Sequence, residues 1–103
     1  MSYKVIISDE AHNDIDSVLD YIVNSLKNPI AAKNLLCKLE EAYTDLAGNP
    51  FMYAYCTDSR LQKDGYRKVV INNYVLIYRI DATDNNVYVV RFFYGRQNYI
   101  ELV

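Results

Sequence analysis

The stretch YRKVVINNYVLIYRI, residues 66–80, contains two strand-like runs separated by Asn72 and Asn73. β-Branched and aromatic residues dominate both runs, which is the composition typical of strands. Asparagine tolerates the positive φ angles that a two-residue hairpin turn requires. The stretch therefore predicts an antiparallel hairpin with strands at residues 66–71 and 74–80.

Two further segments are expected to add strands to this hairpin. VYVVRFFY, residues 87–94, follows a looser turn at residues 83–86. YKVII, residues 3–7, is short and apolar enough to lie inside a sheet. Because the connections after residue 66 are short, the last three strands are expected to form an antiparallel meander, which the first strand joins after the helices.

Two helices are expected between residues 8 and 48. Ser8 is a good helix N-cap, and Asn28-Pro29 combines a capping residue with the residue favoured at the first helical position. Gly48 and Pro50 are stop signals for the second helix. Each helix has one apolar stripe at three-and-four spacing: Ile15, Val18, Leu19, Ile22, Val23 and Leu26, then Ala32, Leu35, Leu36, Leu39, Ala42, Tyr43 and Leu46. A junction this short predicts an antiparallel helical hairpin.

The predicted architecture is β-α-α-β-β-β, an α+β fold in which the helical hairpin packs on one face of a small, mainly antiparallel sheet. At 103 residues the chain is expected to be one domain, residues 1–103. Residues 51–65 lack periodicity and are expected to be a long connection with Arg60 as its notable cation. No apolar run approaches the roughly 20 residues of a membrane span, and residues 1–7 lack the features of a secretion signal. We therefore expect a cytoplasmic protein without membrane contact.

Charge is divided unevenly along the chain. Residues 1–58 hold four lysines against nine Asp or Glu residues, whereas residues 59–103 hold seven Lys or Arg residues against four Asp or Glu residues. Such asymmetry indicates an interaction surface on the basic half.

Arginines on the predicted strands are the candidates for that surface. If Arg67, Arg79 and Arg91 all point away from the helices, they form a cationic row across the sheet. The alternative is that each is exposed and paired with an acidic residue such as Asp81, Asp84 or Glu101. The candidate residues for binding a target or RNA are Arg60, Arg67, Arg79, Arg91, Tyr94 and Arg96.

Tyr94 and Tyr99 flank Gly95-Arg96 at the end of the last strand. A tyrosine and an arginine so placed can stack on a base, assist proton transfer or anchor a protein partner. The sequence leaves these three roles open.

Other reactive residues point to no site. His12 is the sole histidine and lies in the first turns of an acidic helix, where a solvated side chain is expected. Cys37 and Cys56 lie in dissimilar contexts without zinc spacing, so reduced thiols are expected. We therefore expect no metal site and no cofactor.

In their order and spacing, the segments together resemble the RelE/ParE superfamily of toxins from bacterial type II toxin-antitoxin systems. YKVIISDEAHNDIDSVLDYI is similar to the family's first strand and helix, and residues 29–46 to its second helix, with Asn49-Pro50 as the turn after it. GYRKVVINNYVLIYRI resembles the central hairpin, and VVRFFYGRQNY the last strand with its Gly-Arg tail.

The resemblance implies a growth-inhibiting toxin with one of two targets. RelE-like members are ribosome-dependent mRNA endonucleases (mRNA interferases) that use a cluster of basic residues and often a tyrosine. ParE-like members lack that cluster and inhibit DNA gyrase without being enzymes. On the RelE-like pattern the catalytic candidates are Arg67, Arg96 and Tyr99, with Gln97 as the alternative to Arg96.

Two basic positions of the RelE-like pattern are occupied by Val69 and Val75 in this chain. This favours the ParE-like target, DNA gyrase, over the ribosome and mRNA. An inactive relative that serves only as a binding partner is the third hypothesis. In every case the expected partner is a cognate antitoxin protein with a flexible segment that orders on binding.

Overall fold

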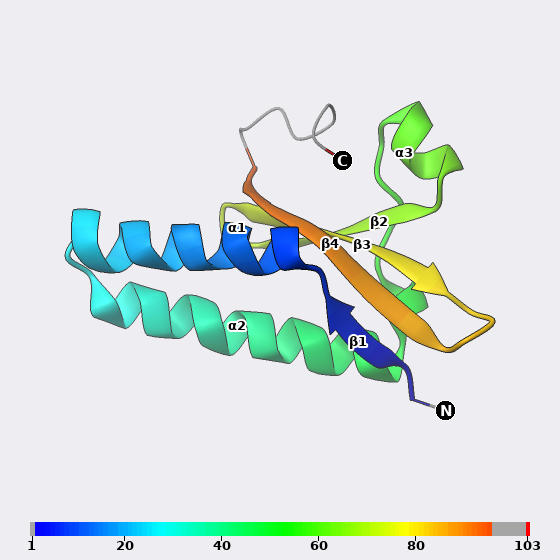
Figure 1. Cartoon of the computed structure of the whole chain (residues 1–103), viewed down its shortest axis with the longest axis horizontal. Helices are drawn as coiled ribbons and strands as arrows, with labels where there is room; N and C mark the ends of the chain where they lie inside the picture. Colours follow the sequence, from blue (N-terminus) through cyan, green and yellow to red (C-terminus); the bar gives the residue numbers. More distant parts are fainter. Residues whose placement is uncertain (1, 96–102) are drawn as a thin grey trace.

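The computed structural model describes residues 2–95 and residue 103. Two long helices, α1 (Asp9–Asp20) and α2 (Pro29–Gly48), lie side by side and cover one face of a four-stranded sheet (Figure 1). The predicted α+β fold and its β-α-α-β-β-β order are confirmed, with small additional helices in the connections.

The sheet has the order β1-β4-β3-β2. β2 (Tyr66–Ile71), β3 (Tyr74–Asp81) and β4 (Asn86–Tyr94) form the predicted antiparallel meander, and β1 (Lys4–Ile7) pairs in parallel with β4. Asn72 has a φ of 55°, which matches the left-handed conformation expected in the hairpin turn.

The helix caps follow the sequence signals. The Ser8 hydroxyl accepts a hydrogen bond from the Ala11 N–H at 3.1 Å, and Asn28 caps α2 in the same way, with Pro29 at its first position. The Ser8 hydroxyl also donates to the Val90 carbonyl at 2.9 Å, so this residue ties the start of α1 to β4.

The first helix does not end in regular α-helix. Its last turn, η1 (Tyr21–Ser25), is a π-helix, a conformation that the apolar spacing did not predict. Lys27, with a φ of 54°, then reverses the chain into α2. The helical hairpin itself is confirmed.

The core has two parts. The larger lies between the helices and the sheet, and its largest fully buried side chains are Leu35, Leu39, Leu46, Leu76, Tyr78, Val87, Val89 and Phe92. The smaller lies against the opposite face and is formed by Cys56, Leu61, Val75 and Ile77.

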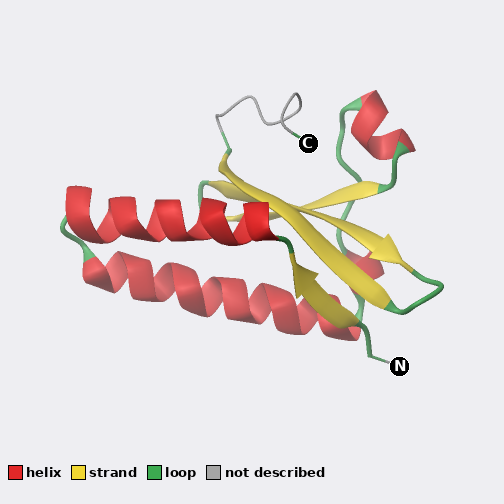
Figure 2. Cartoon of the chain, viewed as in Figure 1, coloured by secondary structure: helices red, strands yellow, loops and turns green. Residues whose placement is uncertain are grey.

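The smaller core depends on a segment for which the sequence predicted only a connection. Between α2 and β2 the chain forms a short 3₁₀ turn, η2 (Pro50–Met52), and a short helix, α3 (Ser59–Lys63). Leu61 of α3 is fully buried against the sheet face that α1 and α2 leave uncovered. Figure 2 shows the two long helices to one side of the strands and α3 well apart from them.

A β-bulge changes the side-chain alternation along β4. Ile77 lies opposite Arg91 but the next residue, Tyr78, lies opposite Val89, so Val90 is an additional residue in β4. As a result Val89 faces the helices, whereas Arg91 lies with Ile77 on the other face. None of the helices in the described residues is long and apolar enough to span a membrane.

Candidate functional site

Arg67, at the start of β2, is held by the connection that follows α2. Its guanidinium carbon lies 3.9 Å from the ring centroid of Tyr55 and 5.5 Å from that of Phe51. Its Nη1 donates to the Tyr53 carbonyl at 2.6 Å. We call Arg67, Phe51, Tyr53 and Tyr55 the Arg67 cluster. Stacking on two rings and bonding to a carbonyl fix the guanidinium in one orientation.

Two tyrosine hydroxyls brace the same region as hydrogen-bond donors. The Tyr78 hydroxyl donates to the Pro50 carbonyl at 2.6 Å, and burial raises the pKa of Tyr78 well above its ordinary value. The Tyr53 hydroxyl donates to Asp45 at 3.2 Å, and burial, reinforced by this carboxylate, raises the pKa of Tyr53. Both hydroxyls therefore stay protonated near neutral pH and serve the structure as donors rather than as bases.

The predicted row of Arg67, Arg79 and Arg91 is wrong. In register Arg67 lies opposite Tyr78, a member of the larger core, so it points to the helix side of the sheet. Arg79 lies opposite Tyr66, which packs on the smaller core, so it points to the other side. The strand parity within β2 held, but Arg67 lies on the helix side of the sheet, whereas Arg79 and Arg91 lie on the other side.

Arg79 and Arg91 have separate partners. The Arg79 guanidinium lies 5.5 Å from the Tyr88 ring centroid. Arg91 forms a two-pronged ion pair with Asp14 of α1, Nε to Oδ2 at 2.8 Å and Nη2 to Oδ1 at 3.1 Å, which raises the pKa of Arg91. Sequence reasoning considered only acidic residues late in the chain as partners and missed Asp14, because the contact spans 77 residues.

The remaining predicted residues are scattered. Arg60 of α3 donates from Nη2 to the Val103 carbonyl at 3.1 Å. Arg96 and Tyr99 lie outside the described residues, so their predicted role stays a prediction.

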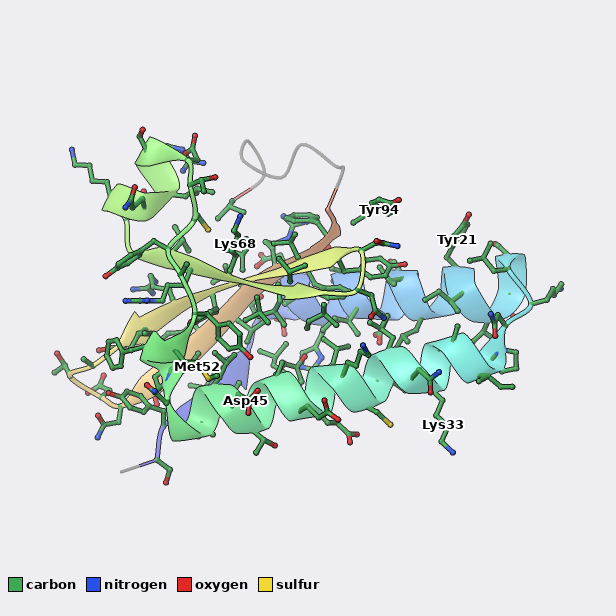
Figure 3. All side chains as sticks on the ribbon, turned by 180° about the vertical axis from the view of Figure 1, so that it is seen from behind. Tyr21, Lys33, Asp45, Met52, Lys68 and Tyr94 are labelled. Carbon is green, nitrogen blue, oxygen red and sulfur yellow. The ribbon has the colours of Figure 1, made fainter. Side chains whose placement is uncertain are left out.

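Tyr94 lies beside a shallow apolar hollow of about 460 Å³ between the tip of the helical hairpin and the end of the sheet. Its ring meets Tyr74 edge to face at 5.8 Å, and Tyr74 stacks on Phe92 at 5.3 Å. Figure 3 shows Tyr21 and Tyr94 projecting on the same side of the molecule. Tyr21, Leu26 and Tyr94 are all more than two-fifths exposed, so the hollow is an apolar surface.

Within the described residues no three His, Cys, Asp or Glu side chains converge in a way that could hold a metal ion. Cys37 is exposed and Cys56 is buried, and burial raises the pKa of the Cys56 thiol. A raised pKa disfavours the nucleophilic thiolate.

Sequence reasoning missed the aromatic half of the Arg67 cluster. Phe51, Tyr53 and Tyr55 lie in the segment PFMYAY, residues 50–55, which has no helical or strand period. Its one usable signal was the density of aromatic residues directly after a helix stop. Phe51 and Tyr55, the two rings that contact Arg67, remain exposed over about half of their surface.

The fold is shared by solved toxin structures of low sequence identity. The toxin-antitoxin complex RelBE2 of Mycobacterium tuberculosis aligns with a TM-score of 0.64 and 20% identity, covering 91% of this chain and 99% of that chain. A chromosomal ParDE system of Pseudomonas aeruginosa gives a TM-score of 0.70 and 16% identity, with 90% and 96% coverage. Escherichia coli RelE in the free state, with two arginines replaced by alanine, gives a TM-score of 0.67 and 12% identity, covering 99% of this chain and 93% of that chain.

These neighbours define the class: the fold is that of the RelE/ParE toxins. The profile of the ParE toxin of the type II toxin-antitoxin system parDE matches residues 5–99. The chain therefore belongs to the ParE toxin family. No curated protein sequence matches it significantly.

Proposed function

We propose that this chain is a growth-inhibiting toxin that binds DNA gyrase in the cytoplasm without being an enzyme, and that a cognate antitoxin neutralises it. Membership of the ParE toxin family supports the toxin role. The choice of gyrase rests on what the chain does with the positions that a RelE-like ribonuclease needs.

The choice of gyrase rests on the surroundings of the positions that hold basic residues in the RelE-like pattern. Arg67, the one matching cation in the described part of the central hairpin, already holds the Tyr53 carbonyl and stacks on Tyr55. Val69 and Val75 are both buried, on opposite faces of the sheet. Cleavage of RNA at the 2′-hydroxyl needs several charged groups converging on one phosphate. Val69 and Val75 supply no such groups, which favours a docking function.

The proposal of an antitoxin partner is supported by solved structures of the same fold. The structures from Mycobacterium tuberculosis and Pyrococcus horikoshii are toxin-antitoxin complexes by their descriptions, the latter at a TM-score of 0.54 and 13% identity. The hollow also exposes the apolar side chains of Tyr21, Leu26 and Tyr94. A flexible partner could cover this apolar surface on binding.

The test is to induce the chain alone in bacteria and to follow DNA and protein synthesis in the first minutes. Failure of DNA synthesis first, with inhibition of supercoiling by purified gyrase in vitro, is the expected result. Early loss of protein synthesis with cleaved mRNA would instead establish the endonuclease. Growth without any defect would identify an inactive relative.

A chain carrying Val69→Lys, Val75→Arg or both is not a suitable control, because each substitution places a charge at a buried position and is expected to destabilise the fold. The matched control is Arg79→Ala, since Arg79 lies on the opposite sheet face from Arg67. If the chain were a RelE-like endonuclease, Arg67→Ala would abolish growth inhibition and mRNA cleavage, whereas Arg79→Ala would leave both unchanged. Circular dichroism checks that both variants stay folded.

A further inference from the structure

The Arg67 cluster presents an aromatic surface at the end of the molecule opposite the tip of the helical hairpin. Phe51 and Tyr55 are 51% and 44% exposed, and Met52, which lies between them in sequence, is 53% exposed. The ring of Tyr3 meets that of Phe51 edge to face at 6.1 Å, which helps to fix the Phe51 ring in place. Figure 3 shows Met52 far from the tip of the helical hairpin. Exposed apolar side chains grouped in this way indicate an interaction surface.

The Arg67 guanidinium at the centre of this surface retains hydrogen-bond donors that the fold does not use. Its Nη1 donates to the Tyr53 carbonyl at 2.6 Å and makes a longer contact, at 3.5 Å, with the Phe51 carbonyl. Among the described residues, Nε and Nη2 have no acceptor and no carboxylate forms a salt bridge with Arg67. The Asp45 carboxylate accepts from the Tyr53 hydroxyl instead. Arg67 therefore presents an oriented positive charge to an anionic group from outside.

The surroundings of Arg67 suit one carboxylate better than a nucleic acid strand. Lys68, the next residue in β2, lies opposite Ile77 and so belongs to the other face of the sheet. Val69 is buried. Binding of a nucleic acid strand draws on several cations that contact successive phosphates. A single arginine matches the two oxygens of one carboxylate, and this favours a protein partner.

The apolar hollow at the tip of the helical hairpin differs from the Arg67 cluster in its charge. No charged side chain is among the residues that line the hollow, which are Ser17, Val18, Tyr21, Leu26, Asn73, Tyr74 and Tyr94. Arginine and tyrosine are enriched at the energetic centres of protein interfaces, and methionine and phenylalanine are enriched in their cores. The Arg67 cluster has this composition together with a fixed cation, so the two surfaces suit different partners.

We propose that the Arg67 cluster and Met52 form the surface through which this chain binds gyrase, and that Arg67 receives an aspartate or glutamate of gyrase flanked by apolar side chains. This inference rests on the proposed function, because it names the part of the toxin that meets the target. Phe51, Met52 and Tyr55 bury apolar area around the ion pair and exclude water from it, which strengthens the pair.

The first test exchanges arginine for lysine at two matched positions. Lysine keeps the charge but loses the planar guanidinium that stacks and bonds in two prongs. Arg67 and Arg79 each lie over a tyrosine ring, that of Tyr55 or Tyr88, on opposite faces of the sheet. The measurement is the concentration of each variant that half-inhibits supercoiling by purified gyrase. We expect Arg67→Lys to raise this concentration by about tenfold and Arg79→Lys to raise it by less than about twofold.

The second test removes apolar area without touching the guanidinium. Met52→Ser is compared with Leu26→Ser in the hollow, because the two side chains are exposed to nearly the same extent, 53% and 55%. We expect Met52→Ser to raise the half-inhibitory concentration about fivefold and Leu26→Ser to raise it less than about twofold. Circular dichroism of all four variants checks that they stay folded.

Two other partners for Arg67 are outcomes of the same tests. Each variant is also titrated with the product of the reading frame adjacent to the gene, as the antitoxin, and with a labelled single-stranded RNA. If Arg67→Lys and Met52→Ser lose affinity for the antitoxin while gyrase inhibition is unchanged, the surface belongs to the antitoxin and the proposal is overturned. RNA binding that Arg67→Lys abolishes, with gyrase inhibition unchanged, would assign the guanidinium to phosphate and likewise overturn it.

The outcomes keep this inference apart from the proposed function. If the unmodified chain inhibits gyrase and Arg67→Lys is equally potent, the docking surface is wrong and the gyrase target stands. Equal losses from Met52→Ser and Leu26→Ser also overturn this surface, because inhibition then depends on exposed apolar area in general. Absence of inhibition by the unmodified chain overturns gyrase as the target, and the inference falls with it.

Discussion

Loss of Asp14 should weaken the attachment of α1 to the sheet. Its Oδ2 accepts from Arg91 Nε at 2.8 Å and from the Phe92 N–H at 3.0 Å, and its Oδ1 accepts from Arg91 Nη2 at 3.1 Å. The Phe92 N–H belongs to the part of β4 that extends beyond β1, so Asp14 takes the place of a strand partner there.

The expected cost follows from these three bonds. A hydrogen bond to a charged group contributes about 1.5–3 kcal/mol when its partners are shielded from water. The side chains of Arg91 and Asp14 are 24% and 17% exposed, so water replaces part of what is lost. We expect Asp14→Ala to lower the free energy of unfolding by about 3 kcal/mol. Asp14→Asn keeps one acceptor for the Phe92 N–H and should cost about half as much.

The assay is urea denaturation of the purified chain followed by circular dichroism, with Asp16→Ala as the control. Asp16 is exposed on the same helix, and its substitution should change stability by less than about 0.5 kcal/mol. For a chain of this size a loss of about 3 kcal/mol lowers the melting temperature by more than about 10 °C. A loss below about 1 kcal/mol for Asp14→Ala would refute the reasoning, because it would mean that water replaces all three bonds.

Two further predictions concern single side chains. Tyr78→Phe should lower the unfolding free energy by about 1 kcal/mol through loss of the bond to Pro50. Because the pKa of Tyr78 is raised in the folded state, its contribution to the unfolding free energy is complete below about pH 10 and is lost as the pH rises further. The stability of Tyr78→Phe should therefore fall less steeply at alkaline pH than that of the unmodified protein. Parallel alkaline stability profiles for the two proteins would contradict this. Gly65→Ala should destabilise the protein by about 1 kcal/mol because Gly65 has a φ of 87°, which an alanine adopts only with strain. Gly48→Ala at the end of α2 is the control and should not destabilise the protein. Thermal melts of both variants test this prediction, and equal losses of stability would contradict it.

The features that sequence reasoning predicted well are those encoded by neighbours in the chain. Ser8 and Asn28 cap helices through bonds to residues three positions away, and Asn72 sets a turn by its own φ. Each signal acts within one turn of the backbone, so it is legible without knowledge of the fold.

The placement of the arginines failed for the opposite reason. The face on which Arg67 or Arg91 lies depends on register with another strand, and the extra residue Val90 reverses the alternation along β4. A bulge leaves no reliable signal in a run such as VYVVRFFY, in which both faces are apolar. The Asp14 contact and the buried Leu61 likewise depend on which distant segments meet.

The parallel pairing of β1 with β4 has a consequence for how the protein matures. Within the described part of the chain, residues 4–7 pair with one strand, at residues 86–89, and the cap of α1 completes its bonding at Val90. During synthesis β1 therefore has no native place in the sheet until residues 86–90 have emerged from the ribosome. Contacts of such long sequence separation close late in folding. The edge strand β1 and the cap of α1 are therefore expected to complete the fold last.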